Sequence, residues 1–138
     1  MDAERRIVDV EAVPTDGSLL FTMKNGTEST EVILLDLADG IVAYENYCPH
    51  WRDVRLDKGS GATLRNEELV CEKHGATFET ESGYCNFGPC EGATLSEVDV
   101  TVEDGGVYLD EAGYRFEQLG GASESDLSSE SRIGFSGN

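Results

Sequence analysis

The chain has 138 residues, of which 38% are apolar, and it carries 28 acidic against 10 basic side chains. This length fits a single domain, and the formal net charge of −18 disfavours nucleic acids and anionic membrane surfaces as partners, because both are negatively charged. An ordinary acidic protein and a protein adapted to very high salt both fit this composition. We favour adaptation to high salt, because molar salt shortens the Debye length to about 3 Å and screens the self-repulsion of the chain.

The N-terminal residues 1–6 are charged and run directly into Ile7-Val8, without the apolar core of a signal peptide. The most apolar run, residues 32–44, is interrupted by acidic residues and by Gly40, and it is far shorter than the roughly 20 residues that span a bilayer. We therefore expect a cytoplasmic protein that does not contact a membrane. Four cysteines in such a chain indicate metal or redox chemistry before structural disulfides.

In chain order, short apolar runs first predict a series of strands, over residues 6–13, 18–23, 30–37 and 41–44. Asn25-Gly26 has the composition of a tight hairpin turn, and Asp39-Gly40 separates the third strand from the fourth. Short strands at this spacing favour an all-β fold, an antiparallel sandwich or barrel.

Residues 45–92 differ from the strands before them, since they are rich in glycine, cysteine and charge and hold only two short candidate strands, over 69–71 and 77–79. Alternation then resumes over 95–102, followed by a turn at 104–106 and a strand over 107–109. We expect one domain over residues 1–119, with a β base that is interrupted by an inserted metal-binding subdomain at about 45–92. The serine-rich, acidic residues 120–138 predict a disordered tail.

Two short motifs carry the chemistry of the chain. Cys48-Pro49-His50 and Cys71-Glu72-Lys73-His74 contain both of its histidines, and each motif offers one thiolate and one imidazole. Two cysteines on one iron and two histidines on the other are the ligands of a Rieske [2Fe–2S] cluster. Neutral histidines leave the oxidised cluster less negative than an all-cysteine cluster, so its potential is higher.

A structural zinc site is the main alternative, which would make the chain a zinc-stabilised interaction module. Zinc usually takes C-x₂₋₄-C or H-x₃₋₅-H pairs, and the C-x-H spacing at Cys48 and His50 is too tight for that pattern. Cys85 and Cys90 remain outside both motifs. They are buried thiols, a disulfide, or ligands of a second metal, and the buried thiols are the simplest of the three.

The two motifs together resemble those of Rieske-type ferredoxins, and the acidic composition resembles haloarchaeal members of that group. The resemblance covers about residues 5–115 and includes 83–90, which is similar to the Gly-Pro loop that covers the cluster in the family. It implies an antiparallel β base with a cluster-binding subdomain, and one [2Fe–2S] cluster held by Cys48, His50, Cys71 and His74.

Departures from the family pattern predict a low potential. High-potential members join an extra cysteine of each ligand loop in a disulfide, and Asp53 and Lys73 stand at those positions here. The members also place a serine and a tyrosine as hydrogen-bond donors to the cluster, where this chain has Ala76 and Phe78. Fewer donors stabilise the reduced cluster less.

The motifs and the resemblance together predict a soluble, monomeric one-electron carrier that has no substrate chemistry of its own and exchanges electrons with redox partner proteins. The alternative is a small Rieske subunit of an oxygenase or of a nitrite-reductase-like complex. Residues 48–74 hold five acids and five bases, so this segment is neutral in a strongly acidic chain. We expect the neutral segment to form the face on which an acidic partner docks.

Overall fold

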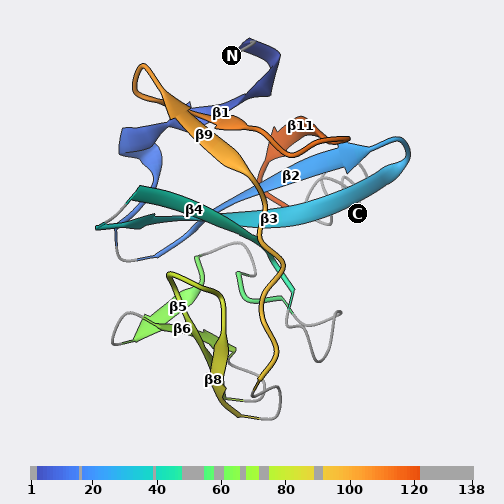
Figure 1. Cartoon of the computed structure of the whole chain (residues 1–138). Helices are drawn as coiled ribbons and strands as arrows, with labels where there is room; N and C mark the ends of the chain where they lie inside the picture. Colours follow the sequence, from blue (N-terminus) through green and yellow to red (C-terminus); the bar gives the residue numbers. More distant parts are fainter. Residues whose placement is uncertain are drawn as a thin grey trace, which may run out of the picture.

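The computed structural model describes residues 3–15, 17–38, 40–47, 55–57, 61–65, 68–71, 75–88 and 92–121. These residues form strands in three antiparallel sheets (Figure 1). Sheet A has the order β1-β10-β9, with strands at Arg6–Asp9, Gly106–Leu109 and Val100–Glu103. Sheet B has the order β11-β2-β3-β4, with strands at Arg115–Leu119, Leu19–Asn25, Glu28–Leu37 and Gly40–Glu45. Sheet C has the order β5-β6-β7-β8, with strands at Thr63–Arg65, Glu68–Cys71, Ala76–Glu79 and Cys85–Phe87.

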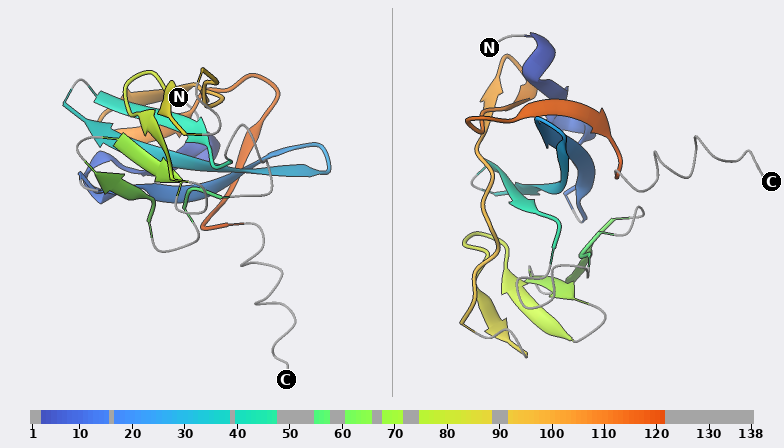
Figure 2. Two further views of the ribbon diagram at one scale, coloured as in Figure 1. Left: turned by 90° about the horizontal axis from the view of Figure 1, so that it is seen from below. Right: turned by 90° about the vertical axis from the view of Figure 1, so that its right-hand side faces the viewer.

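Sheet B is the middle layer, because side chains from its two faces enter different cores. Along β3, Val32 and Leu34 belong to the core shared with sheet A, whereas Ile33 and Leu35 belong to the core shared with sheet C. All four are at most 1% exposed, and burying an aliphatic side chain of this size contributes about 1.5–3 kcal/mol. Sheets A and B thus form the base, and sheet C is a separate layer below it (Figures 1 and 2).

Two predicted turns are confirmed. Asn25 pairs with Glu28 across the β2–β3 hairpin, and Gly26 takes the positive φ of +62° that favours glycine in such turns. Between β9 and β10, Asp104 and Gly105 both have positive φ, as a type I′ turn requires.

Two of the predicted strands are wrong in extent. The strand expected over 6–13 ends at Asp9 and gives way to a short 3₁₀-helix at Val10–Ala12. The strand expected over 95–102 is regular only from Val100. Before that point, the chain crosses from one layer to another along the edge of β4. Leu95 therefore packs in the core shared with sheet C, and Val98 packs in the core shared with sheet A. The spacing of these two apolar residues reflects two separate cores and not one continuous strand.

The all-β antiparallel fold is confirmed, but three strands, β5, β8 and β11, were not predicted from the sequence. Each has three to five residues and lacks a run of β-branched residues. Hydrogen bonding to the adjacent strand of its sheet, and not local sequence preference, makes each of them a strand. The predicted domain limits of 1–119, 45–92 and 120–138 stay predictions, and residues 122–138 lie outside the described part. Within the described ranges, no helix is long and apolar enough to cross a membrane.

Candidate metal centre

Of the four predicted ligands, the structure describes Cys71. Cys48, His50 and His74 lie outside the described residues, as does Cys90. Cys71 is the last residue of β6, and its side chain is fully buried. The predicted ligand sulfur is therefore positioned by the central part of sheet C.

The hairpin between β6 and β7 closes directly after Cys71. Cys71 pairs with Ala76 in the antiparallel register, and the Gly75 amide donates a hydrogen bond of 2.7 Å to the Cys71 carbonyl. Gly75 has a φ of +72°, which a residue with a side chain adopts at a cost. The register therefore fixes the backbone at Cys71 and at Gly75, the residues on either side of 72–74 in the sequence.

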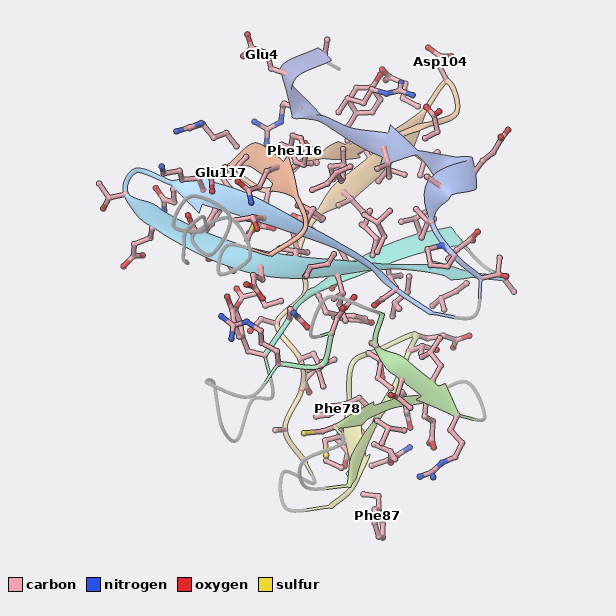
Figure 3. All side chains as sticks on the ribbon, turned by 180° about the vertical axis from the view of Figure 1, so that it is seen from behind. Glu4, Phe78, Phe87, Asp104, Phe116 and Glu117 are labelled. Carbon is pink, nitrogen blue, oxygen red and sulfur yellow. The ribbon has the colours of Figure 1, made fainter. Side chains whose placement is uncertain are left out.

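The Cys71 side chain lies in an apolar environment. It shares a buried cluster with Leu69, Ala76, Phe78 and Cys85, none of which has measurable exposure. Sulfur atoms lie beside Phe78 within sheet C (Figure 3). Neither Ala76 nor Phe78 carries a hydroxyl, so these two side chains line this buried apolar cluster without offering a hydrogen-bond donor.

The predicted covering segment, residues 83–90, includes strand β8, and its Gly88 lies against Ala76, the first residue of β7. Gly88 has a φ of +107°, and a Cβ built there would stand 2.7 Å from the Ala76 Cα. Cys85 is buried in the same layer, and its Sγ lies 3.3 Å from the Phe87 carbonyl oxygen. The predicted alternatives for the pair Cys85 and Cys90 stay predictions, and Cys90 lies outside the described residues.

Three buried polar side chains, one on β3 and one on each side of the first motif in the chain, have a role that sequence reasoning did not predict. Glu31, Asn46 and Asp57 are each at most 1% exposed, although such residues are usually at the surface. Arg55, which we expected in a neutral docking segment, donates from Nε to the Glu31 carboxylate at 2.6 Å. Its charge is therefore matched by a buried carboxylate of the base and is not available in full to a partner.

Tyr44 connects sheet B with the turn after β7. Its hydroxyl donates to the Thr80 carbonyl at 2.8 Å, and a Cβ at Gly83 would stand 2.9 Å from its ring. Burial of the hydroxyl raises the pKa of Tyr44 to about 12, with further increases from the charges of Glu97 and Glu81. The phenol therefore stays neutral at physiological pH and acts as a structural donor.

These features fit a cluster with two sulfur and two imidazole ligands. The buried Cys71 sulfur lies at the end of a strand, and the backbone at Gly88 stands so close to Ala76, the residue paired with Cys71, that a side chain would not fit there. Among the described residues, no three histidine, cysteine, aspartate or glutamate side chains lie close enough to hold a metal ion. The described residues thus supply one ligand and the frame around it.

Comparison with known proteins agrees with this arrangement. The family model described as Rieske [2Fe–2S] domain matches residues 6–102. The oxidoreductase NdmD of Pseudomonas putida is 41% identical over 54 residues, which are 39% of this chain and 8% of that protein. The chain therefore spans less than a tenth of the length of this curated relative.

Two solved structures share the fold. The ferredoxin of Sphingomonas yanoikuyae B1 superimposes with a TM-score of 0.59 at 23% identity, over 77% of this chain and 96% of the ferredoxin. The ferredoxin of carbazole 1,9a-dioxygenase from Nocardioides aromaticivorans IC177 gives a TM-score of 0.60 at 20% identity, over 77% and 95%. At these identities the likeness establishes the fold alone.

Proposed function

We propose a function from one premise: the chain belongs to the Rieske [2Fe–2S] domain family and holds one Rieske-type cluster. Such a cluster takes up and releases a single electron. The chain is therefore a Rieske-type electron carrier, and we propose that it acts as a low-potential ferredoxin without substrate chemistry of its own. The family match over residues 6–102, which includes both ligand motifs, is the observation that carries this conclusion.

We propose Cys48 and Cys71 as the ligands of one iron, and His50 and His74 as the ligands of the other. The motif spacing supports this assignment, as does the burial of Cys71 at the end of β6. The other ring nitrogen of each histidine would be left to exchange a proton as the oxidation state changes.

Cysteine substitution tests the ligand assignment, with a control from the same layer. The purified full chain should show the visible absorption of a [2Fe–2S] cluster, and its reduced form a Rieske electron paramagnetic resonance (EPR) spectrum. Cys71→Ser should abolish or alter both spectra. Cys85→Ala is the matched control, because Cys85 is equally buried in the same cluster but is not a proposed ligand. Zinc in place of iron, with no visible spectrum, would instead support the zinc-stabilised module and overturn the proposal.

We further propose that the cluster end of sheet C is the docking face for acidic redox partner proteins. The equal numbers of acids and bases over residues 48–74 support this, although Arg55 pairs with Glu31. Phe87 also supports it. Its side chain is 66% exposed and points away from sheet C at the end opposite the base (Figure 3).

A role as the ferredoxin component of an oxygenase is the second candidate. The structural neighbour that is a ferredoxin of carbazole 1,9a-dioxygenase has the same fold and suggests this second candidate. Size-exclusion chromatography and co-purification from the native cells distinguish the two, since a monomer favours the free carrier and a stable complex with a large oxygenase favours the component.

We also propose a division of the chain into a Rieske domain over residues 1–119, with its cluster-binding subdomain at about 45–92, and a disordered tail over 120–138. A cytoplasmic location and adaptation to high salt complete the proposal. The net charge of −18 supports salt adaptation. Limited proteolysis should remove the tail and leave a domain that retains the cluster.

A further inference from the structure

Asn46 is a fully buried asparagine that follows β4 and precedes Cys48 by two residues. Its carboxamide contacts the chain on the other side of the first ligand motif. The Oδ1 atom accepts hydrogen bonds from the backbone amides of Leu56 and Asp57 at 3.1 Å and 2.7 Å. The Nδ2 atom donates to the Asp57 carbonyl at 2.7 Å. One side chain therefore joins the two ends of the segment that contains Cys48 and His50.

The same carboxamide also anchors this closure to the base. Its Nδ2 donates to Glu31 Oε1 at 3.2 Å, and the Asn46 amide donates to the Glu31 carbonyl at 2.9 Å. Arg55 Nε reaches Glu31 Oε1 at 2.6 Å from beyond the motif. One buried carboxylate oxygen on β3 thus receives hydrogen bonds from both sides of the first motif.

The segment after the closure is fixed as well. The Ser18 hydroxyl donates to Asp57 Oδ2 at 2.7 Å, and the Gly61 amide donates to Asp57 Oδ1 at 3.0 Å. The Ser18 oxygen in turn accepts from the Ala62 amide at 2.8 Å. Asp57 is 1% exposed, so these hydrogen bonds within the protein, and not water, hold its carboxylate in place.

Asn46 uses the whole hydrogen-bonding capacity of its side chain. A carboxamide has two N–H donors and two acceptor lone pairs, and the four contacts with Glu31, Leu56 and Asp57 occupy all of them. Aspartate at this position would keep the shape but replace two donors with an acceptor that faces the Glu31 carboxylate and the Asp57 carbonyl. No other natural side chain of that size offers the same four contacts.

We propose that Asn46 is a positioning residue for the [2Fe–2S] cluster, which acts by closing the base of the first ligand segment and fixing Cys48 and His50 relative to Cys71. The inference rests on the proposed ligand assignment. A metal site keeps its ligand geometry only when the surrounding residues lock it, and neither Asp53 nor Lys73 offers the disulfide that braces the two loops in high-potential members of the family. Hydrogen bonds to sheet B take over that function for the first segment.

The test compares the full chain with Asn46→Asp and with Arg55→Gln, a milder change that removes only the contact of a partly exposed side chain. Val107→Ala is the control, because Val107 is fully buried in the core between sheets A and B and its truncation lowers stability without touching the first motif. The readouts are the EPR spectrum of the reduced cluster, the reduction potential and the rate of cluster loss to a chelator.

We expect Asn46→Asp to lose the cluster at least tenfold faster and to shift the EPR spectrum, and Arg55→Gln to show the same changes to a smaller degree. Val107→Ala should unfold at a lower temperature with unchanged spectrum and potential. If Asn46→Asp does not fold, Arg55→Gln decides the question. Spectra and potentials identical to wild type in the folded variants would overturn the inference, whereas a wild-type chain without a Rieske spectrum would overturn the proposed function.

Discussion

Gly88 stands against Ala76 so closely that a Cβ on Gly88 would lie 2.7 Å from the Ala76 Cα and 2.9 Å from its Cβ. This contact joins the predicted covering segment, residues 83–90, to β7, the strand that follows the second ligand motif. The neighbouring atoms belong to the backbone of β7, which cannot move aside as a flexible side chain does.

We therefore expect Gly88→Ala to displace the covering segment and to accelerate the loss of the cluster. Gly92→Ala is the matched control, because Gly92 also has a positive φ, of +96°, but a Cβ there would meet no atom within 4 Å. The control should lose only the about 1–2 kcal/mol that positive φ costs a residue with a side chain. Cluster-loss rates and urea unfolding measure the two effects, and equal cluster loss in both variants would contradict this account.

The environment of Phe78 predicts the reduction potential. Phe78 and Ala76 are buried beside Cys71 and offer no hydroxyl, so we expect a potential of about −150 mV, at the lower end of the Rieske range. Phe78→Tyr should raise the potential, because a hydroxyl donor near the cluster stabilises the reduced state. Phe116→Tyr, which adds the same hydroxyl on β11 of the base, should leave it unchanged. A redox titration of wild type that gives a value well above zero would refute the prediction.

Tyr44 predicts how stability responds to alkaline pH. The pKa of its phenol is raised from 10.0 to about 12 in the folded chain. The unfolded chain therefore releases this proton first, and the contribution of Tyr44 to stability is complete below pH 10 and is lost as pH rises toward 12. The loss amounts to about 2–3 kcal/mol, since one pKa unit corresponds to about 1.4 kcal/mol.

Tyr44→Phe isolates this effect. At pH 7 the variant should be about 1 kcal/mol less stable, because the hydrogen bond to the Thr80 carbonyl is missing. The difference between wild type and variant should shrink as pH rises above 10. Urea unfolding at constant salt from pH 7 to pH 11 measures it, and a constant difference over that range would show that Tyr44 does not titrate differently in the two states.

The charge of the chain predicts that salt stabilises it. The net charge of −18 makes self-repulsion large in dilute buffer, and about 1 M salt screens it. The free energy of unfolding should therefore rise with KCl, although partly exposed ion pairs such as Lys24–Glu117 weaken. The same titration near the isoelectric pH of 4.2 is the control, since little repulsion remains there. Stability that falls with KCl at neutral pH would argue against adaptation to high salt.

Phe87 predicts a partner contact. Its exposed ring lies on β8 at the end of the molecule opposite the base (Figure 3), and aromatic residues of this kind are enriched at binding interfaces. Phe87→Ser should slow electron transfer from the native reductase by about tenfold, which corresponds to 1.4 kcal/mol, without changing the potential. Leu119→Ser is the matched control, because Leu119 is 53% exposed on β11 of the base. Stopped-flow rates that fall equally in both variants would exclude a specific docking role.

The sequence by itself determined the cofactor and the class of fold. Two C-H motifs with a short internal spacing predict a mixed sulfur and imidazole ligand set, because ligand chemistry depends on residue types that are close together in the chain. Alternating apolar residues and turns such as Asn25-Gly26 specified antiparallel strands, because both signals are local. Leu95 and Val98 are apolar because they enter two different cores. Their spacing resembled the alternation of a single strand, so the predicted strand began too early.

Only the tertiary structure decided which polar side chains join the two ends of the chain that flank the first motif. Nothing in the sequence distinguishes three buried polar residues, Glu31, Asn46 and Asp57, from polar residues at the surface. They are buried because β3, the end of β4 and the segment after the first motif pack together. Arg55 likewise changed from an expected docking charge to the partner of a buried carboxylate. The physical reason is the same in each case. A hydrogen bond between residues that are 10 to 24 positions apart depends on how the layers pack, and no local pattern in a single sequence records it.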